Sequence, residues 1–150
     1  MSAIRMVLLR GTAAGLIGTA VMTLAQQLEM SVTGRDPSIV PGQVAAELLP
    51  QTEPAPAPGL SISAHWAHGA MMGPLRAGLA ATGLSGPRGS AVFFGLMWVG
   101  DVLLYRVLGI ADWPWRWTRN ELATDLGHKA LYAIATGVSY DALAKRGSRG

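Results

Sequence analysis

Residues 11–28 form a run of 18 positions without a charged side chain, and this run constrains the fold more than any other feature. Arg5 and Arg10 precede it. At 1.5 Å of rise per residue, a helix of this length extends about 27 Å, close to the roughly 30 Å hydrocarbon core of a bilayer. We therefore expect a first transmembrane helix over residues 8–30. The basic start and the small residue Ala25 would also suit a cleaved signal peptide.

Three later segments have the length of a membrane span, although each contains charged residues. They cover residues 61–84, 90–110 and 120–143. Only 14% of the chain is charged, against about 25% in soluble proteins, which indicates that most of the chain lies in lipid. The expected fold is an all-α integral membrane protein, a four-transmembrane-helix bundle forming one domain over residues 1–150. A soluble protein with ordinary amphipathic helices is the alternative.

Basic residues predict the orientation of such a bundle. Four spans place both termini on one side of the membrane, and six basic residues fall on that side against three on the other. The six are Arg5, Arg10, Arg88, Lys145, Arg146 and Arg149, and the three are Arg35, Arg116 and Arg119. Cytoplasmic loops are rich in Lys and Arg. We therefore expect both termini in the cytoplasm.

The connections contain two local signals. The only long one covers residues 31–60, where Pro41 can open a short helix through Leu49. The alternating prolines that follow predict a stiff extended spacer; they are Pro54, Pro56 and Pro58. Between the third and fourth expected helices, three tryptophans alternate with other residues, as in an anchor at a membrane interface. They are Trp113, Trp115 and Trp117.

Several polar side chains of the four expected helices fall at one depth. Counted at 1.5 Å per residue from the side opposite to the termini, they lie within roughly 5–14 Å of the same boundary. These residues are Gln27, His65, His68, Asp101, Asp125 and His128. Polar groups inside a membrane face the bundle interior or a wet cavity. We therefore predict one interior polar pocket that opens on the non-cytoplasmic side.

Imidazoles and carboxylates together are the parts of a proton relay, so this cluster predicts a protein that handles protons or small ions. Two alternatives stay open. The cluster can be structural, tying the helices of a non-catalytic accessory or scaffold subunit by hydrogen bonds. It can also bind a metal through His65, His68 and His128, or a haem between His68 and His128, because imidazole is a common metal ligand.

Other ionisable residues are expected to have simpler roles. Arg76 and Asp141 lie near the cytoplasmic boundary, where their side chains can extend to the headgroups. The chain has no Cys, which excludes disulfides and thiolate sites. The glycines follow no G-x-G-x-x-G or Walker pattern, so we expect no nucleotide. The sequence contains no catalytic motif and requires no cofactor. The expected partners are the lipid bilayer and a larger membrane complex or further copies of the chain, and not nucleic acid.

Small residues indicate where helices approach one another. Gly11, Gly15 and Gly18 lie on the first expected helix, and Gly69 and Gly73 on the second. Such spacing allows two backbones to come close in a membrane. We expect these glycines to pack helices within the chain.

Two stretches of the chain are faintly alike. His65-Trp66-Ala67-His68-Gly69-Ala70 and His128-Lys129-Ala130-Leu131-Tyr132-Ala133 agree at their first, third and sixth positions. This pattern suggests two helix pairs in parallel duplication.

Three features of the sequence resemble a known family. They are the run GTAAGLIGTAVM at 11–22, the turn DPS at 36–38 and the two helix starts just described. The chain resembles the YagU-like group of small four-helix bacterial inner-membrane proteins. The resemblance implies a multi-pass envelope protein and supplies no catalytic residues.

Overall fold

The computed structural model describes residues 2–49 and 59–147, and this part of the chain is all-helical, with no strand in it. Four helices are long: α1 (Ala3–Thr33), α3 (Leu60–Ala81), α4 (Gly86–Val107) and α5 (Arg119–Gly147). A short helix, α2 (Val40–Leu48), follows α1, and a single turn of 3-10 helix, η1 (Pro114–Arg116), precedes α5. The four long helices expected from the sequence are confirmed, and so is the short helix at Pro41. The predicted proline spacer lies outside the described residues.

Glycine and proline set several of the helix ends. Gly34 ends α1 in the left-handed region, with φ of 69°, and its N–H bonds to Met30 O. Pro87 lies in the first turn of α4, where its missing N–H has no helical partner to lose. Gly109, with φ of 70°, follows the end of α4. Each end falls within a few residues of the position expected from hydrophobicity alone.

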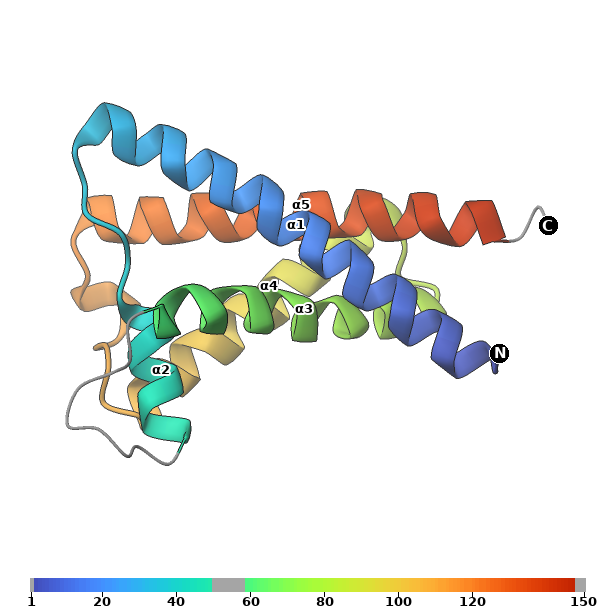
Figure 1. Cartoon of the computed structure of the whole chain (residues 1–150), viewed down its shortest axis with the longest axis horizontal. Helices are drawn as coiled ribbons and strands as arrows, with labels where there is room; N and C mark the ends of the chain where they lie inside the picture. The colour runs from blue at the N-terminus through green and yellow to red at the C-terminus, as the bar shows by residue number, and fades with distance from the viewer. Residues whose placement is uncertain (1, 50–58, 148–150) are drawn as a thin grey trace.

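The long helices alternate in direction (Figure 1). α1 and α4 run one way, α3 and α5 run the other way, and the start of α1 and the end of α5 lie at the same end of the molecule. We call this the terminal end, and the opposite end, which contains α2 and η1, the loop end. α1 crosses α3 and α5 and packs on both, while α4 packs mainly on α5.

Glycines allow α1 and α3 to approach closely. A Cβ added to Gly11 would lie 2.9 Å from Gly73 O, and one added to Gly15 would meet the carbonyl oxygen of Gly69. Gly18 lies against α5 instead, beside Tyr132. The expectation that these small residues pack helices within the chain is confirmed.

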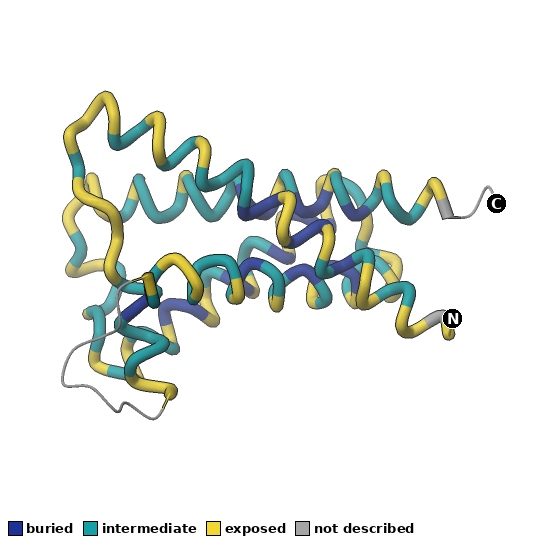
Figure 2. Tube along the Cα trace, viewed as in Figure 1, coloured by how far each residue is buried: buried dark blue, intermediate teal, exposed yellow. Residues whose placement is uncertain are grey.

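Only a few residues in the middle of the bundle are buried (Figure 2), and many large apolar side chains are exposed on its outside. One buried cluster contains Phe93, Met97, Tyr132 and Ala133, and another contains Ala14, Ala77 and Tyr140. Large apolar side chains are exposed on all four long helices. Examples are Leu24 and Leu28 on α1, Met71 on α3, Val99 and Leu103 on α4, and Ile134 and Val138 on α5.

Two helices are long and apolar enough to cross a membrane: α1 over Ile4–Thr33 and α4 over Gly86–Val107. Only 28% and 22% of their most apolar stretches are buried inside the molecule, so neither is enclosed like the core helix of a soluble domain. Among the described residues, α3 and α5 do not meet this criterion of length and apolarity. Both carry charged and polar side chains between their ends, and these are the residues that form the sites described next.

Candidate functional site

Lys129 of α5 lies at the centre of a group of charged side chains between three helices. Its Nζ is 2.9 Å from Asp125 Oδ1, one turn earlier in α5, and 3.2 Å from Asp101 Oδ2 of α4. The Lys129 and Asp101 side chains are only 13% and 6% exposed. The ammonium thus holds two carboxylates on neighbouring helices.

α3 contributes an imidazole to this group. His68 Nε2 lies 3.0 Å from Asp101 Oδ1, so both oxygens of this buried carboxylate have a nitrogen partner. The His68 side chain is 41% exposed, in contrast to Asp101. We call His68, Asp101, Asp125 and Lys129 the Lys129 network.

Aromatic side chains enclose the network. Trp98 Nε1 donates a hydrogen bond of 2.8 Å to Asp125 Oδ2. The ring centroid of Tyr105 lies 5.0 Å from Lys129 Nζ, a cation–π distance. One turn toward the terminal end, Tyr132 donates a 2.6 Å hydrogen bond to Gly69 O and packs on Phe93 in the apolar cluster. An apolar layer therefore separates the network from the terminal end.

The charges of the network nearly cancel. It contains two carboxylates, one ammonium and one imidazole. With His68 neutral the sum is one negative charge, and with His68 protonated it is zero. A net charge is costly in a low-dielectric interior. Whether the network carries a net charge thus depends on whether the His68 imidazole carries a proton.

The structure brings together three of the six residues predicted for this site: His68, Asp101 and Asp125. His65 points to α1 instead, where its Nε2 lies 3.0 Å from Thr23 Oγ1. In the described part of the chain, His128 and Gln27 make no hydrogen bond or ion pair with the network. Gln27 is exposed on α1. The structure therefore places three of the six predicted residues in one network and the other three outside it.

Sequence reasoning missed Lys129 and Trp98 as members of the site. A signal for Lys129 was present, because it follows Asp125 by four residues, the spacing at which opposite charges meet on one helix face. The polar stripe chosen for α5 passed through His128, one position away, and one position turns a helix by about 100°. Nothing in the sequence around Trp98 indicates that its indole bonds to Asp125.

The three histidines do not form a metal site. His65 lies against α1, His68 pairs with Asp101, and His128 is not joined to either. Over residues 2–49 and 59–147, no group of three or more His, Cys, Asp or Glu side chains is suited to hold a metal ion. The expected metal or haem alternative thus gains no geometric support from these residues.

Arg76 corrects one sequence-based expectation. It was expected to extend to the headgroups, yet its side chain is 0% exposed, and Nη2 lies 2.9 Å from Asp141 Oδ1. Asp141 also accepts a 2.9 Å hydrogen bond from the N–H of Gly86 at the start of α4. Two glycines leave space for the guanidinium. A Cβ added to Gly89 would lie 3.2 Å from Arg76 Nη2, and one added to Gly137 would lie 3.3 Å from Arg76 Nε. Arg76 therefore stays inside the bundle and joins α3, α4 and α5.

The loop end is ordered by local polar contacts. Arg35 donates hydrogen bonds of 2.6–3.2 Å to both carboxylate oxygens of Glu29, which raises the pKa of the guanidinium above its ordinary value. The rings of Trp113 and Trp115 stack with centroids 5.1 Å apart. Trp117 Nε1 donates a 2.7 Å hydrogen bond to Asp112 O. The tryptophan-rich segment is thus folded by contacts within itself.

Comparison of this chain with models of protein families, with curated proteins and with solved structures gives no match.

Proposed function

We propose that the chain is a multi-pass protein of the bacterial inner membrane, and that the Lys129 network binds and releases a proton as part of proton or small-ion handling. All four long helices would cross the bilayer. The observation that supports the activity most directly is the pairing of a half-exposed imidazole, His68, with a nearly buried carboxylate, Asp101.

The charges at the two ends favour the membrane placement with both termini in the cytoplasm. Besides the buried Arg76, the described basic side chains at the terminal end are Arg5, Arg10, Arg88, Lys145 and Arg146. The one described acidic group there is Asp141, which Arg76 already pairs. The loop end carries both signs, as in the Glu29–Arg35 and Asp112–Arg116 pairs. An excess of Lys and Arg on one side is typical of the cytoplasmic side.

The position of the network favours exchange with the loop end. His68 lies eight residues into α3, about 12 Å along the helix from its start at that end. The layer of Phe93, Met97 and Tyr132 closes the other direction. A proton lost from the His68–Asp101 pair leaves one net negative charge, which a small cation from the loop end would balance. Proton and cation would then compete for one site.

Trp98 offers a direct test of proton binding, because its indole donates to Asp125 of the network. In a variant whose other four tryptophans are replaced by phenylalanine, we expect Trp98 fluorescence to change between about pH 5 and 8, the range in which histidine titrates. His68→Gln should remove this transition. His65→Gln and His128→Gln are matched controls and should keep it. A transition that persists in His68→Gln would contradict the proposal.

Transport is tested separately in proteoliposomes loaded with a pH-sensitive dye. We expect wild-type protein to dissipate a proton gradient faster than empty vesicles. Asp101→Asn should lose this activity while His65→Gln retains it. Wild-type flux equal to that of empty vesicles would refute transport and leave proton binding alone, as in a sensor.

A structural role is the second candidate, and the Arg76–Asp141 pair favours it. That pair links three helices with no histidine involved, so this chain does use buried charges to hold helices together. As an accessory or scaffold subunit, the protein would co-purify with a larger membrane partner. His68→Gln would then lower the melting temperature without removing any pH-dependent signal.

A further inference from the structure

Asp101 lies between two groups that can carry a positive charge. Its Oδ1 is 3.0 Å from His68 Nε2, and its Oδ2 is 3.2 Å from Lys129 Nζ. The Asp101 side chain is only 6% exposed, so water has little access to it. A change of charge on one side of this carboxylate therefore acts with little screening on the group at the other side.

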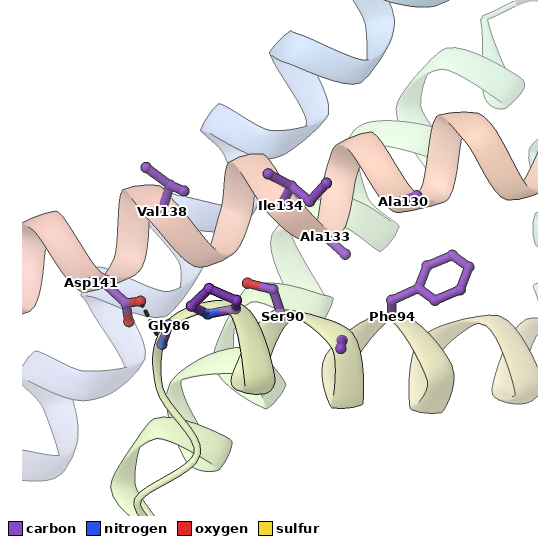
Figure 3. Close-up of a pocket in the computed structure, with 10 residues that line it drawn as sticks. Gly86, Ser90, Phe94, Ala130, Ala133, Ile134, Val138 and Asp141 are labelled. Atoms are coloured by element: carbon purple, nitrogen blue, oxygen red, sulfur yellow. Dashed lines mark hydrogen bonds between the residues drawn. The ribbon is translucent and has the colours of Figure 1, made fainter.

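Lys129 is fixed in its place inside the bundle. Asp125 holds the same ammonium at 2.9 Å, and the Tyr105 ring lies against it. The next residue along α5, Ala130, lines an apolar groove on the outside of the bundle, between α4 and α5 (Figure 3). Lys129 does not line that groove, and its side chain is 13% exposed. The ammonium thus faces the two carboxylates and not the outer surface.

Three helices supply the ionisable groups around His68. They are Asp101 and Tyr105 on α4, Asp125 and Lys129 on α5, and His65 one turn earlier on α3. On the α1 side, the uncharged Thr23 lies 3.0 Å from the His65 ring. Among these groups, Lys129 is the one that is positively charged at neutral pH whether or not the histidines carry protons.

We propose that Lys129 is a positioning residue that sets the pH range in which His68 binds and releases its proton, and that it acts through Asp101. This inference rests on the proton binding proposed above and adds its regulation. The ammonium opposes a second positive charge next to Asp101 and compensates part of the charge of that carboxylate. Without it, the network with a neutral His68 would carry two negative charges and would hold a proton more strongly.

The expected size of the effect follows from charge and distance. Only one carboxylate group separates Lys129 Nζ from His68 Nε2. Two unit charges about 7 Å apart, at an effective dielectric constant of about 20, shift the midpoint of protonation by roughly 1–2 pH units. Such a shift is large enough to move His68 out of the physiological range.

The test follows each histidine ring separately. The chain has three histidines, so NMR of ¹³C-labelled imidazoles in detergent gives three signals, each assigned by its loss in the corresponding His→Gln variant. In a pH titration, Lys129→Gln should raise the midpoint of His68 by about 1–2 pH units. Lys129→Arg keeps the charge and should restore a midpoint near that of wild type. Lys145→Gln, the same substitution at the terminal end of the same helix, is the matched control and should leave the midpoint unchanged.

A second variant tests the opposite direction. Asp125→Asn removes a negative charge from the network and leaves the Lys129 ammonium to Asp101 alone. The midpoint of His68 should therefore fall, by roughly 0.5–1 pH unit. This variant keeps the Lys129 side chain and nearly the same shape, so it tests the proposal even if Lys129→Gln does not fold. His65 is the internal reference, and its midpoint should move less than that of His68 in both variants.

A Lys129 that only holds helices together gives a different result. In that case Lys129→Gln would lower the melting temperature and leave the midpoint of His68 unchanged, which overturns the proposal. Equal midpoints in Lys129→Arg and Lys129→Gln would also overturn it, because the charge would then have no effect. A wild-type His68 that does not titrate between about pH 5 and 8 would instead refute proton binding itself. The two proposals therefore fail on different measurements.

Discussion

Among single residues, Gly73 shows how little space separates α1 from α3. A Cβ there would lie 2.6 Å from the Gly11 carbonyl carbon and 3.0 Å from Gly15 N, which are backbone atoms and cannot turn away. We expect Gly73→Ala to lower the free energy of unfolding by about 1–3 kcal/mol, as overpacking does. Gly78 in the same helix has nothing within 4 Å. Gly78→Ala should therefore stabilise by up to about 1 kcal/mol.

Denaturant titration in detergent, followed by circular dichroism, measures both glycine variants. Each is the control for the other, because the chemical change and the helix are the same. Equal stability of Gly73→Ala and Gly78→Ala would show that α1 and α3 are not in backbone contact.

Arg76 supports a second prediction for a single residue. Removing one partner of a buried pair leaves the other charge uncompensated. Arg76→Leu should therefore cost about 3 kcal/mol in the same denaturant titration, and adding Asp141→Leu should recover part of this loss. Arg106, exposed with its Cζ 5.9 Å from the Trp113 ring, is the comparison, and Arg106→Leu should cost less than about 1 kcal/mol. Arg76→Leu as stable as wild type would contradict a buried ion pair.

The network shows how far single residues can be predicted. His68, Asp101 and Asp125 were found by depth, because the rise of a helix is constant along every segment. The helix to which a side chain points is harder to predict, because it depends on which side of α5 packs against α4. Tyr132, Ala133 and the residues near them are buried on that side. The spacing of apolar residues along α5 does not determine which side packs in this way. Hence Lys129, and not His128, reaches Asp101.

Among the helices, α2 depends on its neighbour. A helix of nine residues is marginal alone in water. Ser61 at the start of α3 holds it: Ser61 Oγ accepts a 3.2 Å hydrogen bond from Gly42 N and donates one of 3.2 Å to Ser38 O. We expect Ser61→Ala to speed amide hydrogen exchange in α2 by about fivefold, from the loss of about 1 kcal/mol.

Mass spectrometry of peptides covering residues 38–49 measures this exchange. Ser63, two residues further along α3 and exposed, is the matched control, and Ser63→Ala should leave α2 unchanged. Unchanged exchange in Ser61→Ala would mean that apolar contacts alone hold α2 in place.

Helix boundaries were predictable where a residue forces them. Pro41 placed α2. Gly34 and Gly109, both with positive φ, follow α1 and α4, and the expected segment 90–110 runs past the second of them. Helix ends that contain charged residues were harder to predict, because the apolar residues stop before the helix does. Thus α1 extends three residues beyond the expected end at residue 30, and the Glu29–Arg35 hydrogen bonds hold that extension.

For the whole molecule, the prediction that tests the four-span architecture is the side of the membrane on which each end of the bundle lies. Four spans would put the start of α1, the turn after α3 and the end of α5 on one face, and α2 with η1 on the other. The chain has no Cys, so single cysteines at Ser2, Ser85, Ser38 and Trp115 can be labelled without background. We expect a membrane-impermeant maleimide outside spheroplasts to label Ser38→Cys and Trp115→Cys only. Labelling of Ser2→Cys and Ser85→Cys alone would reverse the orientation. Labelling of Ser38→Cys but not Trp115→Cys would put the two sites on opposite faces, so only one of the two long helices between them, α3 and α4, would cross the membrane.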